Sequence, residues 1–171
     1  MDEAKTIKSP QGSALKNEII KRTNGDALKC FNCGTCTASC PVMRINSKYN
    51  PRRIVRMLIL GLDLPDEGVI WMCSTCHTCH ERCPQGVNLP EVMNVLKNIA
   101  VEKGRIHPSF KKQIELLEKQ GRLYEIGDFD NKKRVKAGLP EIHAHNKNIK
   151  KIFKSTGVDK LVESLETKNE Q

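Results

Sequence analysis

Two four-cysteine blocks constrain this chain more than any other feature of its sequence. The first block runs from Cys30 to Cys40 and is followed by Pro41; the second runs from Cys73 to Cys83 and is followed by Pro84. Both have the spacing C-x2-C-x2-C-x3-C-P, and together they use all eight cysteines. In bacterial-type iron–sulfur proteins, three cysteines of such a block bind one cluster and the fourth binds the other. The pattern therefore predicts two [4Fe-4S] clusters.

The spacing also predicts how the ligands are shared. Two residues between cysteines let the chain wrap a compact cube, and small residues between Cys33 and Cys40 allow a close approach of the backbone. Gly34 can adopt a positive φ without a steric penalty. The fourth cysteine of each block follows after three residues and is expected to point away from the first three. We assign the first cluster to Cys30, Cys33, Cys36 and Cys83, and the second to Cys73, Cys76, Cys79 and Cys40.

Two other uses of cysteine fit the pattern less well. Zinc ribbons use two C-x2-C pairs per metal ion, without a third and fourth cysteine in this rhythm. A disulfide framework is typical of secreted proteins. Here Met1 is followed by Asp2 and Glu3, and no apolar signal region comes next. Reduced cysteines of this kind predict a cytoplasmic protein.

The formal net charge of +9 raises the question of nucleic-acid binding. Two oxidised clusters with their thiolates add about −2 each, which brings the loaded protein nearer to about +5. Lysines and arginines are spread along the chain and mixed with acids, so we expect a docking surface for an acidic partner and no nucleic acid. The apolar stretch 57–62 is far short of the roughly 20 residues that cross a bilayer, so no membrane span is expected.

Hydrophobic periodicity and capping residues predict a mainly α protein. We expect an amphipathic helix after the Asn50-Pro51 pair, another after Asn88, and no sheet, because no segment alternates between apolar and polar residues. The segment 122–140 is charged and interrupted by glycine and proline, and is predicted to be an irregular connector. The expected organisation is an N-terminal extension with a short helix (1–24), a two-cluster domain (25–106) and a C-terminal helical extension (107–171). Further helices are expected at 13–22, 108–120, 146–156 and 158–166.

Three other residues near the second block have less specific signals. Trp71 is expected to pack against the cluster or the adjoining helix. His77 and His80 lie between predicted ligands, but four cysteines already suffice for a cube, so neither histidine is expected to bind iron. They are expected to be exposed, or to hydrogen bond near the sulfurs and tune the potential.

The two blocks, with a helix-bearing spacer between them, resemble the alpha-helical ferredoxin module. That module occurs in the iron–sulfur subunits of succinate dehydrogenase, fumarate reductase and glycolate oxidase. The run from Cys33 to Pro41 is most similar to the first block of the family formed by the C subunits of methanogen heterodisulfide reductases. The resemblance covers about residues 25–110.

This resemblance implies a function in electron transfer. In that family, the C subunit passes electrons from a flavin-containing A subunit to the B subunit, whose cysteine-rich CCG sequences serve reduction of the CoM-S-S-CoB heterodisulfide in methanogenesis. A hydrogenase or formate dehydrogenase is a further expected partner. This chain has no Cys-Cys-Gly run and no Rossmann-type glycine fingerprint, so we expect a non-catalytic electron-transfer subunit of an oxidoreductase. The alternatives are a relay subunit of a glycolate, lactate, succinate or fumarate oxidoreductase, and a zinc-bound structural adaptor.

Overall fold

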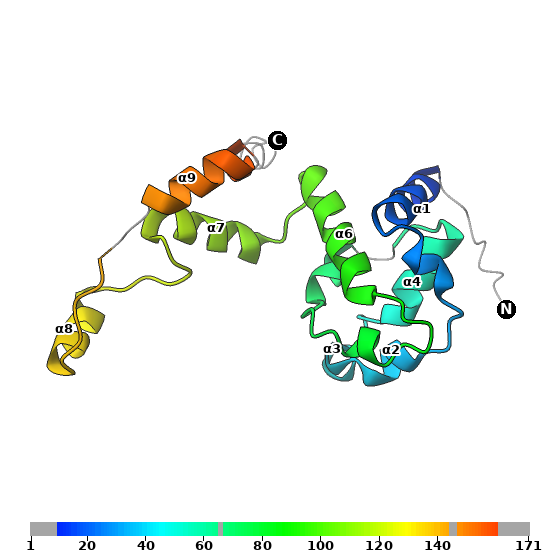
Figure 1. Cartoon of the computed structure of the whole chain (residues 1–171), viewed down its shortest axis with the longest axis horizontal. Coiled ribbons are helices and arrows are strands. Elements are labelled where there is room, and N and C mark those ends of the chain that lie inside the picture. Colours follow the sequence, from blue (N-terminus) through cyan, green and yellow to red (C-terminus); the bar gives the residue numbers. More distant parts are fainter. Residues whose placement is uncertain (1–9, 65–66, 144–146, 161–171) are drawn as a thin grey trace. The chain divides into compact units, whose positions relative to one another are not determined.

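The computed structural model describes residues 10–64, 67–143 and 147–160 of the chain. These residues form helices and connecting loops, with no strand within the described ranges, which confirms the mainly α prediction (Figure 1). The contacts divide the chain into two compact units, Met1–Glu102 and Lys103–Gln171. The elements are α1 (Pro10–Arg22), η1 (Asp26–Lys29), α2 (Thr35–Ser39), α3 (Pro41–Ile45), α4 (Pro51–Leu60), η2 (Glu67–Met72), α5 (Thr78–Glu81), α6 (Leu89–Glu102), α7 (Pro108–Gln120), α8 (Asp128–Lys136) and α9 (Lys147–Thr156).

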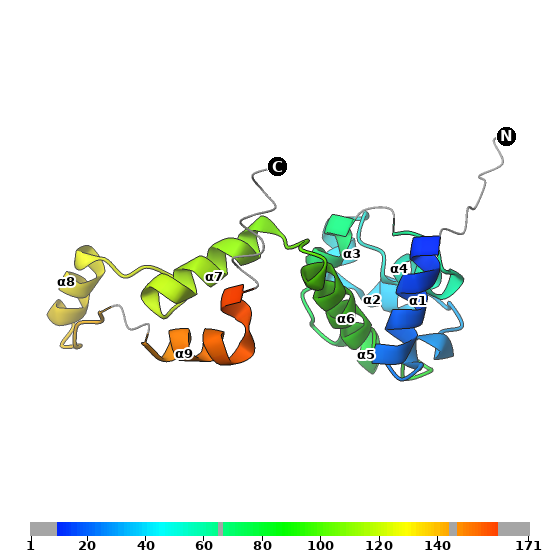
Figure 2. The same cartoon turned by 90° about the horizontal axis from the view of Figure 1, so that it is seen from above.

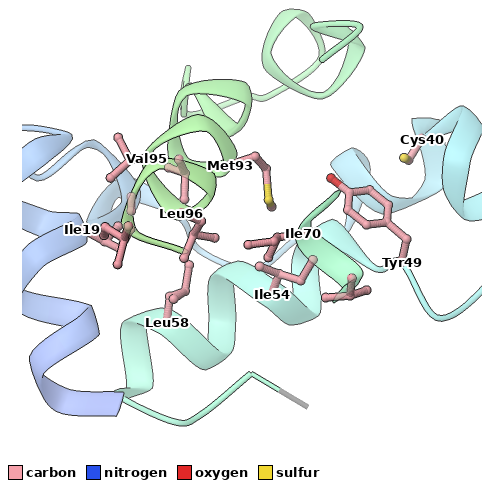
Figure 3. Close-up of a cluster of buried hydrophobic side chains, with 13 residues drawn as sticks. Ile19, Cys40, Tyr49, Ile54, Leu58, Ile70, Met93, Val95 and Leu96 are labelled. Carbon is pink, nitrogen blue, oxygen red and sulfur yellow. The ribbon is translucent and has the colours of Figure 1, made fainter. Parts of the chain in front are cut away.

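In the first unit, three longer helices enclose the hydrophobic core. Helix α1 packs against both α4 and α6, and η2 packs against α6. Figure 3 shows side chains from these elements meeting in one cluster. The expected apolar stripe of α6 is confirmed by the burial of its side chains. The core side chains that are at most 3% exposed include Ile19, Ile54, Leu58, Val69, Ile70, Val92, Met93 and Leu96.

Helix α4 begins and ends where the sequence predicts. The Asn50 side chain accepts a hydrogen bond from the backbone N–H of Arg53 at 3.0 Å, and Pro51 occupies the first turn, where a missing N–H costs nothing. Gly61 ends the helix at φ 68°, and its N–H bonds the Leu58 carbonyl. These caps set the direction in which α4 leaves the first cysteine block.

The cysteine blocks fold into very short helices beside this core. Figure 1 shows α2 and α3 below α1, α4 and α6, and Figure 2 shows α5 at the foot of α6. Helices α2 and α5 pack against each other, and α5 also packs against α6. Pro41 starts α3 at the residue after Cys40, so the chain leaves the first block as a new helix with a fixed direction.

Two polar links tie the segments before and after the blocks. The Asn88 N–H donates to Asp26 Oδ2 at 2.6 Å, which joins η1 to the start of α6. The Arg22 guanidinium donates to both carboxylate oxygens of Glu102 at 2.7 and 2.8 Å, which joins the ends of α1 and α6. Both links lie within the first unit and connect residues far apart in the sequence.

The second unit contains α7, α8 and α9, and α7 packs against α9. The prediction that 122–140 is an irregular connector was wrong, because α8 lies within it. This helix has acids in its first turn and bases in its last, which complements the helix dipole, and its residues are mostly polar. Asn131 exchanges two hydrogen bonds with the backbone of Ile142, at 3.0 and 2.9 Å, and so attaches α8 to the following loop.

Helices were also expected in this unit at 108–120 and at 158–166. The helix expected at 108–120 is confirmed as α7, and its Phe110 side chain is 37% exposed. The helix expected at 158–166 falls mostly outside the described residues, and 158–160 are helical. Across the three described ranges, no helix is long and apolar enough to cross a bilayer.

Candidate iron–sulfur centre

The structure gathers the eight cysteines around two separate hollows. The first hollow is lined by four cysteines together with Phe31, Gly34 and Arg52. Three of the cysteines come from the first block, and the fourth comes from the end of the second block. These four are Cys30, Cys33, Cys36 and Cys83.

The second hollow has the reciprocal composition. It is lined by three cysteines of the second block, by the last cysteine of the first block and by Tyr49. These four cysteines are Cys73, Cys76, Cys79 and Cys40. Each hollow therefore brings together the four residues that the spacing predicts for one cluster, and all eight cysteines are free of disulfides.

The backbone around the two hollows follows the same path. Asn32 and Thr75, each just before a cysteine, have φ values of 65° and 52°. Gly34 and His77, each just after that cysteine, have φ values of 89° and 61°. The left-handed conformation on both sides of one residue bends the chain sharply around Cys33 and around Cys76. Three of these four positions are not glycine, so the sequence indicated the bend only at Gly34.

The cysteine at each bend is exposed and is hydrogen bonded to a threonine hydroxyl two residues later. Cys33 Sγ and Thr35 Oγ1 are 3.2 Å apart, and Cys76 Sγ and Thr78 Oγ1 are 3.5 Å apart. The threonine bond is the largest cause that lowers the pKa of each thiol, and Arg52 adds a smaller electrostatic effect at Cys33. At Cys33 and Cys76 this bond favours the thiolate form that iron requires.

The next cysteine in each block turns inward. Cys36 of α2 and Cys79 of α5 both pack against a buried apolar group formed by Val55, Val87 and Leu89. Burial raises the pKa of the Cys36 thiol, and it raises that of Cys79 to about 11, with further increases from the charges of Cys73 and Cys36. Cys30 and Cys83 pack against the same group, so one apolar group contacts cysteines of both hollows, and the two hollows are adjacent.

Backbone groups support the fourth ligand position of the first hollow. The N–H of Val87 donates to Cys83 Sγ at 3.3 Å, while the carbonyl of Val87 lies 3.2 Å from His80 Nδ1. Through Nδ1, His80 holds the loop that follows Cys83. Trp71 packs against the hydrophobic core of the first unit. The supporting role of Val87 was not predicted, because no sequence signal marks a backbone donor.

The donor sets fit an iron–sulfur cube. A zinc ion needs four ligand atoms about 2.0–2.3 Å from one point, whereas a cube presents four separate irons to four thiolates. Within the described residues, no three Cys, His, Asp or Glu side chains are grouped so as to hold a single metal ion. Instead, four sulfurs line each hollow, and thiolates are the ligands that [4Fe-4S] clusters use.

Comparisons with known proteins agree with this geometry. Residues 26–87 match the family model described as a 4Fe-4S dicluster domain. The chain is 36% identical over 156 residues to the C subunit of the H2:CoB-CoM heterodisulfide,ferredoxin reductase of Methanothermobacter thermautotrophicus, covering 85% of this chain and 84% of that protein. The chain belongs to the family of heterodisulfide reductase C subunits. The matched domain and the eight cysteines fit two [4Fe-4S] clusters, as predicted.

Other heterodisulfide reductase C subunits extend the match. The iron-sulfur C 2 subunit of the CoB–CoM heterodisulfide reductase of Methanocaldococcus jannaschii is 39% identical over 127 residues, covering 74% of this chain and 66% of that protein. The C subunit of the ferredoxin:CoB-CoM heterodisulfide reductase of Methanosarcina mazei is 35% identical over 126 residues, covering 73% of this chain and 78% of that protein. Membership of this family confirms the resemblance stated from the cysteine blocks.

Proposed function

We propose that this chain is the electron-transfer subunit of a heterodisulfide reductase complex in methanogenesis. It relays electrons from a flavin-containing A subunit to a CCG-containing B subunit, which reduces the CoM-S-S-CoB heterodisulfide. The observation that carries the proposal is the pair of adjacent four-cysteine hollows, with Cys36 and Cys79 packed against one apolar group. Support comes from relatives that are themselves C subunits of heterodisulfide reductases.

The eight cysteines would hold the clusters by crossed ligation. Cys83 completes the first set and Cys40 completes the second, so each block contributes to both sites. When bound, each cluster takes up and releases a single electron. The chain's own residues hold the two sites close together and keep water from the space between them: Val55 and Val87 are 0% exposed there, and Leu89 is 2% exposed.

The outer and inner sides of the two sites have different roles in this proposal. Cys33 and Cys76 are exposed, so the edge of each site at these residues is accessible to a partner protein. Cys36 and Cys79 lie on the inner sides, against the shared apolar group. One exposed edge would serve the electron donor and the other the acceptor.

The chain is proposed to be non-catalytic by itself. All eight cysteines are assigned to clusters, and a fully ligated cube has no open iron at which a disulfide could bind. The chemistry of the substrate is therefore assigned to a partner protein in the cytoplasm. A hydrogenase or formate dehydrogenase would supply electrons to the larger complex.

The test uses the assembled complex and two electron sources. Cys36→Ser should strongly reduce electron flow from the flavin subunit to the heterodisulfide, because one site of the relay loses a ligand. It should largely spare heterodisulfide reduction by an artificial dye that feeds the catalytic subunit directly. Ala38→Ser is the matched control, since it adds the same hydroxyl to an exposed position of α2 and should leave both activities unchanged.

Two results would contradict the relay. One is an equal loss of both activities in a Cys36→Ser complex that remains assembled. The other is heterodisulfide reduction by the isolated chain at a rate comparable to that of the complex.

A further inference from the structure

Tyr49, in the loop between α3 and α4, is a buried tyrosine beside the second hollow. Its side chain is 2% exposed, whereas Tyr124, the other tyrosine of the chain, is 64% exposed. Figure 3 shows the Tyr49 ring in the buried cluster that also contains Cys40. A buried phenol hydroxyl usually has a hydrogen-bond partner, so the neighbours of this one indicate its role.

The neighbours of Tyr49 are the cysteines of the second hollow, which it lines together with all four of them. Cys40 and Cys73 also belong to the apolar cluster in which Tyr49 packs. Burial, followed by the interaction with Cys73 and by the charges of Cys40 and Cys79, raises the pKa of Tyr49. A phenol hydroxyl is a hydrogen-bond donor, and the fold places this one in a hollow lined by four sulfurs.

A second positively polarised group is directed at the same cysteine. The half-buried Lys97 ammonium of α6 donates to the backbone carbonyl of Cys73 at 3.0 Å. This bond fixes the backbone at Cys73 and places a cation near the second hollow. Tyr49 and Lys97 thus approach Cys73 from two different elements of the first unit.

The first hollow is built differently. Its lining contains no tyrosine, and its cation, Arg52, is exposed and therefore screened by solvent. The hydrogen bond to Cys83 comes from the backbone N–H of Val87, which a side-chain substitution does not remove. The two hollows have similar backbone conformations, but only the second is lined by a tyrosine hydroxyl.

We propose that Tyr49 is a positioning residue that raises the reduction potential of the second [4Fe-4S] cluster by donating a hydrogen bond to Cys73. A reduced cluster carries one more negative charge, which its sulfurs share, so a donor stabilises the reduced form more than the oxidised form. The effect is strong in a buried site, where the local dielectric constant is low. The proposal rests on the two-cluster part of the proposed function and is independent of the partner proteins and substrate.

The test is a redox titration of the full chain, purified anaerobically with both clusters, and followed by EPR. Tyr49→Phe keeps the ring and removes the hydroxyl. At a fixed potential, the ratio of reduced to oxidised second cluster should fall about tenfold, which corresponds to about 59 mV for a one-electron couple. The first cluster should be unchanged, and the matched control Tyr124→Phe should change neither. Signals are assigned with Cys33→Ser for the first cluster and Cys76→Ser for the second.

A second measurement tests the proposal if the Tyr49→Phe protein does not take up its clusters. Fluorotyrosine incorporated into the Tyr124→Phe chain labels Tyr49 alone, conserves its shape and provides a more acidic donor. The potential of the second cluster should then rise. No shift in either measurement, or equal shifts of both clusters, would overturn the proposal. Iron and sulfide analysis separates these results from a failure of the two-cluster assignment, which would show as fewer than about eight irons per chain.

Discussion

Cys36 and Cys79 lie on the helices α2 and α5, which pack against each other, and both cysteines pack against the buried group of Val55, Val87 and Leu89. They belong to different hollows, yet the charge of Cys36 contributes to raising the pKa of Cys79. The apolar group that they share is therefore common to both sites, and a change there should affect both clusters.

Val55→Thr tests this shared group. The substitution keeps the shape of the side chain but buries a hydroxyl, at a cost of about 1–3 kcal/mol in the free energy of unfolding. Both clusters should be lost faster in the presence of a chelator, as measured by the decay of visible absorption and by EPR of each cluster. Val135→Thr on α8, where the side chain is 54% exposed, is the matched control. Selective loss of one cluster would contradict the shared role.

Serine substitution of the fourth cysteine of each block tests the crossed assignment of the ligands. Cys40→Ser should alter the EPR signal of the cluster bound by Cys73 and Cys76, because Cys40 lines the second hollow. Cys83→Ser should alter the other signal. Cys33→Ser and Cys76→Ser serve as references for the two sites. If Cys40→Ser and Cys33→Ser change the same signal and no other, ligation is not crossed.

Substitutions at Gly34 and His77, which follow the cysteines at the two bends, should change the free energy of unfolding in opposite directions. Gly34→Ala places a Cβ at φ 89° and should lower the free energy of unfolding by about 1–2 kcal/mol, since left-handed backbone disfavours side chains. Steric conflict is small, because the nearest atom is Arg52 Cδ at 3.6 Å. His77→Gly, at φ 61°, should be neutral or stabilising by up to about 1 kcal/mol. Chemical denaturation of the loaded proteins measures both, and equal effects of the same sign would contradict the argument.

Asp26 predicts a pH dependence of stability. Burial opposes its ionisation, but the hydrogen bonds from Lys29 and from the Asn88 N–H prevail and lower its pKa. A carboxyl with a depressed folded-state pKa stabilises the protein above its unfolded pKa of about 3.9, and this contribution is lost as the pH falls through the folded-state pKa. Asp26→Asn should therefore destabilise by about 1–2 kcal/mol at pH 7.

The measurement is the difference in unfolding free energy between wild type and Asp26→Asn across pH. This difference should be constant near neutrality and shrink below about pH 4. Glu118→Gln, at an exposed position of α7 in the second unit, controls for the loss of one charge. A difference that stays constant down to the lowest pH at which the protein folds would show that the charge of Asp26 is not involved.

The helical class and the cofactor could be predicted from the sequence, because both depend on local patterns. The cysteine spacing indicates how the chain wraps a cube. The Asn50–Pro51 pair and Gly61 predict where α4 begins and ends. Helix α8 was missed because its residues are mostly polar, so hydrophobic periodicity carried no signal. The start of α8 is instead supported by Asp130, whose carboxylate accepts a hydrogen bond from the Gly127 N–H at 3.2 Å.

The residues that surround the sulfurs could not be predicted for a different reason. Tyr49 and Lys97 reach Cys73 from loops and helices distant in the sequence, and nothing in their own neighbourhoods indicates a sulfur partner. Positive φ at Asn32, Thr75 and His77 is likewise imposed by the wrapping of the chain, since these residue types do not require it. Such features follow from tertiary contacts alone.

Each hollow is lined by residues that are far apart in the sequence, and this has a consequence for biosynthesis. The first is lined by residues from Cys30 to Leu89 and the second by residues from Cys40 to Pro90. During translation the N-terminal part emerges first, so a ribosome that has just finished the first block exposes cysteines of which neither set is complete. Neither hollow can therefore form until the second block has left the ribosome, and a chain truncated between the blocks would lack part of the lining of both.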